Sequence, residues 1–178
     1  MEASVISFVA VLFLFSYSLA VSANIAKVDE VCNNLEYWYI TPQVCHSVLD
    51  TDPQSRHAAD INGVGVIAAN IVAKNAAQTL VSVRRIASAT SDPKQKKQLV
   101  TCVSIYTNIS FKLNAVVASI KSRKYSAALE VMGEAIAVPM MCYNAVTYDN
   151  LKKELDRVGI QFSTVVSVGQ AVVNYISR

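Results

Sequence analysis

The fold is decided by residues 93–124, which read PKQKKQLVTCVSIYTNISFKLNAVVASIKSRK. The apolar residues of this stretch recur at alternating spacings of three and four, at Leu99, Cys102, Tyr106, Ile109, Leu113, Val116 and Ile120. That spacing places them on one face of a long α-helix. Asp92 can cap the first turn, and Pro93 suits the first helical position. The stretch therefore predicts one long amphipathic helix.

Three other segments repeat the same period. One helix is expected from about Asp60 to Ala87. The next stripe consists of Ala128, Val131, Ala135, Val138 and Cys142. The last consists of Leu151, Leu155, Val158, Phe162, Val165, Gly169, Val172 and Ile176. Pro139 should bend or weaken the end of its helix. Four long helices joined by short connections predict an all-α protein with an up-down four-helix bundle.

Composition agrees with a folded helical domain. The 178 residues are 53% apolar and 16% charged, which excludes a disordered chain. Only five Gly and four Pro occur, too few for a β-protein rich in turns. The formal net charge is +3, and Lys and Arg are spread along the chain. Nucleic acid is therefore not an expected partner.

The N-terminus has the pattern of a secretory signal peptide over residues 1–23. An apolar run extends from Val5 to Val21, and the small residues Ser22 and Ala23 follow it. This places the cleavage site after Ala23. An N-terminal membrane anchor is the alternative, but the short run favours cleavage. The protein is therefore expected outside the cell.

The mature chain, residues 24–178, is expected to form one domain. A short helical hairpin over 24–55 precedes the bundle over 56–178. The stretch Val158–Ser177 has no charged residue, so a membrane span is an alternative for it. Polar residues recur there every three or four positions, at Gln161, Thr164, Ser167, Gln170 and Asn174. A soluble amphipathic helix explains this stripe better, so no membrane contact is expected after cleavage.

The four cysteines, Cys32, Cys45, Cys102 and Cys142, all follow the leader. An even number in an exported chain predicts two disulfides. Cys102 and Cys142 lie at equal distances from a turn near Ser122–Lys124, so an antiparallel hairpin brings them together. Cys32 and Cys45 are related in the same way by a turn near residues 38–42. The predicted pairs are therefore Cys32–Cys45 and Cys102–Cys142, and no metal site or cofactor is expected.

Catalytic residues are not expected. The mature sequence has no HExxH, Walker, GxSxG or GxGxxG motif. His46 and His57 are its only histidines, and Glu130 and Glu134 lie off the apolar stripe on a solvated helix face. We therefore expect that the protein is not an enzyme. Asn108 begins an N-glycosylation sequon on the outer face of its helix, and an unused sequon in a rigid helix is the alternative.

A basic cluster marks the turn after the deciding stretch. Lys121, Arg123 and Lys124 are followed by Tyr125. A solvated turn is one interpretation. The other is a cationic tip with an aromatic residue that enters an acidic cleft. Glycosidase clefts carry paired carboxylates, so a lysine ammonium could take the place of a developing sugar cation. Three further lysines, between 94 and 97, are expected to be a solvated first turn.

The sequence resembles the plant invertase and pectin methylesterase inhibitor family, in particular its pollen-allergen branch. The resemblance covers Val28 to Cys142. It is carried by Cys32, Thr41-Pro42, Cys45, Leu49, Asp52-Pro53, the stretch DINGVGVIAAN at 60–70, Asp92-Pro93, Leu99, Cys102, Tyr106, Lys124-Tyr125-Ser126-Ala127 and Cys142. The resemblance implies a helical hairpin packed on a four-helix bundle, with adjacent cysteines paired.

The resemblance also implies a partner. Members bind a secreted carbohydrate-active enzyme one to one and block its active-site cleft. The targets are acid invertases of the cell wall or vacuole, or pectin methylesterases of the wall. A Pro-Lys-Phe motif of the invertase inhibitors matches Arg123-Lys124-Tyr125, with arginine in place of proline. Residues 143–146 also depart from the acidic and aromatic pattern usual in the family.

The leading hypothesis is a secreted inhibitor that is monomeric when free, with invertase slightly ahead of pectin methylesterase as target. Its expected location is the apoplast or cell wall, with the vacuole as the alternative. Lys124 is the expected inhibitory contact. Two other hypotheses stay open: a carrier of small apolar ligands in the bundle core, and a pollen allergen scaffold without an enzyme target.

Overall fold

The computed structural model describes residues 27–35, 37 and 39–178. The predicted signal peptide lies outside the described residues. Residues 27–33 are helical, and the following elements are α2 (Pro42–Leu49), the 3-10 helix η1 (Pro53–His57), α3 (Ile61–Ala89), α4 (Pro93–Lys121), α5 (Tyr125–Ala145) and α6 (Asp149–Ile176). The described part of the chain contains no strand. The predicted all-α class is therefore confirmed.

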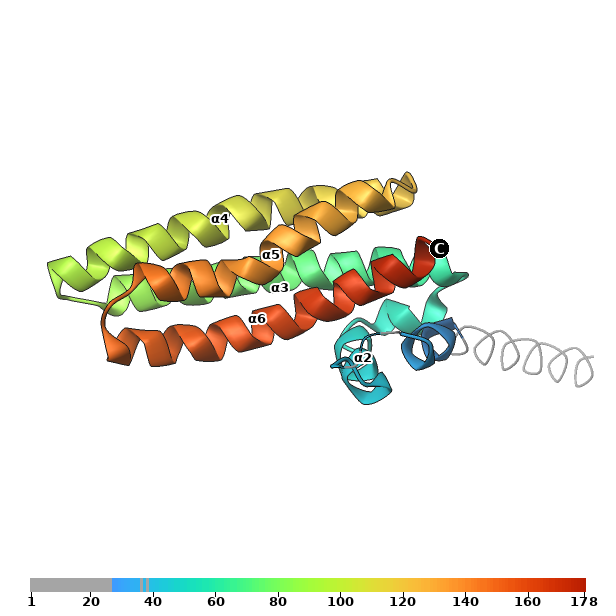
Figure 1. The fold of residues 1–178 in the computed structure, drawn as a ribbon, viewed down its shortest axis with the longest axis horizontal. Helices are drawn as coiled ribbons and strands as arrows, with labels where there is room; N and C mark the ends of the chain where they lie inside the picture. Colours follow the sequence, from blue (N-terminus) through green and yellow to red (C-terminus); the bar gives the residue numbers. More distant parts are fainter. Residues whose placement is uncertain (1–26, 36, 38) are drawn as a thin grey trace, which may run out of the picture.

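The four long helices form the predicted up-down bundle (Figure 1). Each of α3, α4 and α5 packs against the next helix along the chain, and α6 closes the bundle by packing against α3. Aspartates start two of these helices. The Asp60 side chain accepts a hydrogen bond from the Gly63 N–H, and the Asp92 side chain accepts bonds from the N–H groups of Lys94 and Gln95. These caps satisfy backbone donors that the first helical turn leaves free.

The bundle core follows the predicted stripes. Tyr106 of α4 and Phe162 of α6 meet edge to face, with ring centroids 5.5 Å apart, and both are buried. Burial raises the pKa of Tyr106 to about 12, so its hydroxyl stays neutral at any physiological pH. Three stripe positions differ by one residue: Met132, Gly159 and Val166 are buried, whereas the predicted Val131, Val158 and Val165 are only partly buried. In each case both neighbours lie within one wide apolar face, and a spacing of three or four residues fits either.

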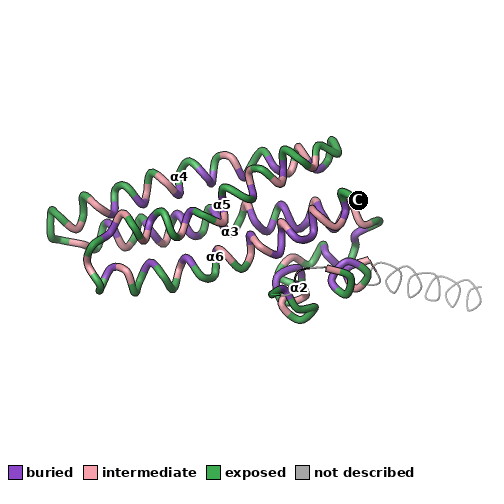
Figure 2. Tube along the Cα trace, viewed as in Figure 1, coloured by how far each residue is buried: buried purple, intermediate pink, exposed green. Residues whose placement is uncertain are grey.

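A second core explains the uncharged stretch of α6. The N-terminal hairpin packs on α3 and α6 through a cluster that includes Val31, Leu49, Ile67, Val168 and Val172. The C-terminal half of α6 is thus buried against the bundle on one side and the hairpin on the other (Figure 2). Charged residues would be desolvated on both sides.

Among the described helices, α3 is also long and apolar enough to cross a membrane, by length and composition alone. More than half of its apolar window (56%) is buried inside the protein. Its apolar side chains are therefore accounted for by the two cores.

Both predicted disulfides are present. Cys32 and Cys45 are joined with their Cα atoms 5.5 Å apart, and Cys102 and Cys142 with theirs 4.8 Å apart. The first bridge closes the hairpin, and the second joins α4 to α5. The predicted pairing is confirmed. The helix α5 continues through Pro139 to Ala145, and Gly159 of α6 leaves room for the proline ring, since a Cβ there would lie 2.9 Å from the Pro139 Cβ.

Gly169 of α6 packs tightly against α3, and this contact predicts a large response to one added methyl group. A Cβ at Gly169 would lie 2.5 Å from Cγ2 of the buried, β-branched Val72. We expect Gly169→Ala to lower the free energy of unfolding by about 1–3 kcal/mol. Gly133 on α5 is the matched control, because the nearest atom to a Cβ there is 3.7 Å away. Gly133→Ala should instead stabilise the protein by about 0.5–1 kcal/mol. Urea denaturation measures both, and a shift of both variants in the same direction would contradict the packing described.

Candidate functional site

The turn between α4 and α5 is short and fixed by backbone hydrogen bonds. Helix α4 ends at Lys121, with Ser122 as its C-cap. The Arg123 N–H donates to the Ile120 carbonyl at 2.9 Å, and the Lys124 N–H donates to the Ser119 carbonyl at 2.8 Å. This pair of bonds is the Schellman motif, which satisfies the last carbonyls of a helix. The turn therefore holds its side chains on a rigid backbone.

Arg123 has a backbone conformation that the sequence pattern did not predict. Its φ is +57°, the only positive value among the described non-glycine residues. The Schellman motif requires this left-handed conformation. A proline here could neither adopt a positive φ nor donate to the Ile120 carbonyl. The arginine that replaces the proline of the Pro-Lys-Phe motif is thus compatible with this turn, and a proline is not.

This geometry predicts opposite effects of two substitutions. Arg123→Pro should lower the free energy of unfolding by about 2–3 kcal/mol, because it removes one hydrogen bond and forces the backbone out of the left-handed region. Arg123→Gly should leave stability unchanged or raise it by up to about 1 kcal/mol, because glycine adopts a positive φ without strain. Thermal and urea denaturation measure both. Equal stability of the proline variant and the natural protein would show that the turn is not built this way.

The three basic side chains of the turn, Lys121, Arg123 and Lys124, are exposed. Within the described part of the chain, none of them forms an ion pair with a carboxylate. We call these three residues the basic tip. The basic tip lies at the end of the bundle where α3 begins and α6 ends (Figure 1). The basic tip therefore presents positive charge to solvent on a fixed backbone, and such charge attracts acidic groups.

Tyr125 does not project with the basic tip. Its side chain is half-buried against the core, and its hydroxyl donates to Oδ1 of Asn62 at 2.9 Å. Asn62 lies in the first turn of α3, so this bond ties the start of α5 to the start of α3. The three cations of the basic tip are thus exposed, whereas the neighbouring Tyr125 points inward and anchors the start of α5 to α3.

The other predicted residues lie away from the basic tip. Asn108 is exposed on α4, where a glycan has room, and the use of this sequon stays a prediction. Glu134 pairs with Lys112 across α4 and α5, and Glu130 is exposed, in agreement with a solvated face. His46 lies 3.4 Å from a carboxylate oxygen of Asp29 on the hairpin. Among the described residues, no group of three His, Cys, Asp or Glu side chains could hold a metal ion.

The basic lysines at the other end of the bundle are also exposed. They occupy the first turn of α4, where their charges meet the positive end of the helix dipole. Beyond Cys142, the ring of Tyr143 lies 4.7 Å from the Lys152 ammonium, a cation–π contact between α5 and α6. The departure from the family pattern at 143–146 therefore has at least one structural role.

The family model of the plant invertase/pectin methylesterase inhibitors matches residues 26–172 of this chain. The chain belongs to this family. Two curated relatives, each named "Putative invertase inhibitor", come from the plane trees Platanus orientalis and Platanus acerifolia. The first is 30% identical over 132 residues, covering 74% of each chain. The second is 30% identical over 146 residues, covering 77% of this chain and 78% of the relative.

Among solved structures, the crystal structure of a pectin methylesterase inhibitor from Arabidopsis thaliana has the same fold as this chain. The TM-score is 0.59 at 15% sequence identity, and the match covers 86% of this chain and 97% of the other. At this identity the match shows the fold. The hairpin and four-helix bundle described above are therefore the architecture of a solved protein as well.

One feature near the hairpin was not predicted from the sequence. The side chains of Asn75, Gln78 and Gln161 line a polar groove between α3 and α6. Gln161 belonged to the predicted polar stripe of the last helix, but its partners on α3 lie more than eighty residues earlier. The sequence signal nearest to this groove is the polar stretch KNAAQT at 74–79, which interrupts the apolar spacing of α3.

Proposed function

We propose that the mature protein, residues 24–178, is a secreted inhibitor that forms a one-to-one complex with a plant acid invertase and blocks its active-site cleft. Family membership supports an inhibitor rather than an enzyme, and the names of the plane-tree relatives favour invertase over pectin methylesterase. The basic tip carries the proposal, because its cations are exposed, pair with no carboxylate of the described residues, and stand on a backbone that the hydrogen bonds of the turn hold in place. The two disulfides agree with the oxidising compartments of the secretory route.

In this proposal, the Lys124 ammonium enters the cleft and lies against the catalytic carboxylates. Glycosidases place a pair of Asp or Glu side chains on either side of the scissile bond, and their transition state has positive charge on the sugar. An ammonium group in that position forms charge-assisted hydrogen bonds with the carboxylates. Arg123 supplies a second positive charge, and Tyr125 holds the base of the turn. Substrate is excluded because the tip occupies its place.

The location and form of the protein follow from the same proposal. Removal of residues 1–23 would release a soluble monomer into the apoplast or cell wall, with the vacuole as the alternative compartment. A carrier role has less support, because the space between the four helices is filled by fully buried side chains such as Leu99, Tyr106, Leu113, Met132 and Phe162.

Titration of purified enzymes tests the proposal. Recombinant mature protein should lower the activity of a cell-wall or vacuolar acid invertase at about pH 5, with an end point near one inhibitor per enzyme. A pectin methylesterase assayed in parallel separates the two targets. Inhibition of the esterase alone would show that the target is pectin methylesterase and not invertase. Failure to inhibit either enzyme between about pH 4 and 7 would overturn the inhibitor function.

A further inference from the structure

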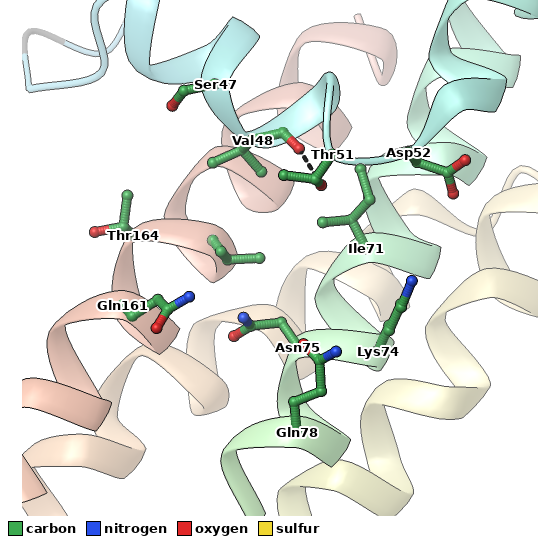
Figure 3. Close-up of a pocket in the computed structure, with 11 residues that line it drawn as sticks. Ser47, Val48, Thr51, Asp52, Ile71, Lys74, Asn75, Gln78, Gln161 and Thr164 are labelled. Atoms are coloured by element: carbon green, nitrogen blue, oxygen red, sulfur yellow. Dashed lines mark hydrogen bonds between the residues drawn. The ribbon is translucent and has the colours of Figure 1, made fainter. Parts of the chain in front are cut away.

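A polar groove runs between α3 and α6 beside the hairpin. It consists of two adjoining pockets with volumes of about 410 and 260 Å³. Asn75, Gln78 and Gln161 line both pockets, so the two form one continuous groove, which we call the amide groove. Figure 3 shows the side-chain amides of Asn75 and Gln161 facing each other across the space between the helices. Volumes of this order suit a small ligand.

The centre of the amide groove has hydrogen-bonding capacity that the protein leaves unused. Oδ1 of Asn75 is buried and accepts no hydrogen bond from the described part of the chain. A buried acceptor without a donor costs free energy, so such atoms are normally satisfied. Amides both donate and accept, as the hydroxyl groups of a sugar do. Ile71 and Val165 supply an apolar wall against which C–H groups can pack.

The groove also carries an excess of positive charge. Arg85 and Arg157 line the end away from the hairpin, and Lys74 lies at the hairpin end together with Asp52, the one acidic residue that lines the groove. None of the three cations forms an ion pair in the described structure. Arginine guanidinium groups bind carboxylates through two parallel hydrogen bonds. A neutral sugar would leave these two arginines without partners.

We infer that the amide groove binds a short saccharide that carries carboxylates. Its hydroxyls bond to the amides of Asn75, Gln78 and Gln161, and its carboxylates bond to Arg85 and Arg157. From Ile71 to Arg85, helix α3 rises about 21 Å at about 1.5 Å per residue, which gives room for more than one sugar ring. This binding goes beyond the proposed function and does not depend on it, because it belongs to the free protein.

Isothermal titration calorimetry of the free, full mature protein tests this inference with three probes. Tri-D-galacturonate has both hydroxyls and carboxylates, maltotriose has hydroxyls alone, and a triglutamate peptide has carboxylates alone. We expect binding of tri-D-galacturonate at least about tenfold tighter than binding of either other probe, weakening as salt is added. Equal binding of maltotriose or triglutamate, or no binding of tri-D-galacturonate, would overturn the inference.

Variants of the groove locate the binding. Arg85→Gln and Gln161→Ala should each weaken tri-D-galacturonate binding by about tenfold. Asn75→Leu should also weaken this binding by about tenfold. If the substitution of the half-buried Asn75 impairs folding, Gln161→Ala tests the same amide contacts. Arg84→Gln is the matched control, because Arg84 is exposed on the same helix but does not line the groove, so its effect should stay below about twofold. Equal effects of Arg84→Gln and Arg85→Gln would show non-specific charge attraction and contradict the site. Since no target enzyme is present, these outcomes are independent of the inhibition assay.

Discussion

Removal of the Cys102–Cys142 disulfide by the double substitution C102A/C142A should lower the free energy of unfolding by about 4 kcal/mol. The bridge closes a loop with a sequence separation of 40 residues. A covalent link restricts the unfolded chain, and the stabilisation grows with the length of the closed loop. Both cysteines are buried, and alanine introduces no polar group into the core. The double substitution therefore changes the stability of the protein and leaves its surface unchanged.

The hairpin disulfide provides the comparison. Cys32–Cys45 has a sequence separation of 13, for which the same relation gives about 3 kcal/mol. Urea denaturation followed by circular dichroism measures the two double variants and the natural protein. We expect the larger loss for C102A/C142A. A loss below about 1 kcal/mol in that variant would contradict the role of the bridge in holding α4 against α5.

Substitution of Lys124 is expected to have the largest effect on inhibition. Lys124→Ala should raise the inhibition constant against the target invertase by about 30-fold or more, equivalent to about 2 kcal/mol or more. Loss of the ammonium leaves the carboxylates of the enzyme without a partner in a cleft from which water has been excluded. Lys124→Glu should have a larger effect, because it places like charges together. Steady-state inhibition assays at low ionic strength measure both variants.

Lys97→Ala is the matched control for this prediction. Lys97 is an exposed lysine in the first turn of α4, at the other end of the bundle from the basic tip. Its removal changes the net charge by the same amount as Lys124→Ala. The inhibition constant should then change by less than about twofold. Equal effects of the two substitutions would mean that long-range charge alone governs binding and that Lys124 makes no specific contact.

The helices and their pairing could be predicted from the sequence because the signals are local. The stripe from Leu99 to Ile120 repeats without interruption, and Asp92-Pro93 marks its start. Two cysteines at equal distances from one turn then determine which helices are bridged. The sequence pattern also predicted the turn between these two helices near Ser122–Lys124, and the structure has the turn there.

The details of the candidate site depend on contacts that no local pattern encodes. The Tyr125 hydroxyl bonds to Asn62, which is 63 residues away in sequence, so its inward direction could not be predicted. The positive φ of Arg123 follows from the way in which α4 ends, and arginine is not a residue type that signals such a conformation. The amide groove combines side chains from the hairpin, α3 and α6, and it exists only once these elements are packed.

Hydrogen–deuterium exchange of the complex tests the central claim most directly, namely that the turn between α4 and α5 makes the inhibitory contact. Amide exchange in the free inhibitor is compared with exchange in the presence of saturating invertase. We predict that exchange slows over residues 119–127 and is unchanged over residues 89–97, at the other end of the bundle. Protection confined to another face, with residues 119–127 exchanging as in the free protein, would contradict the claim.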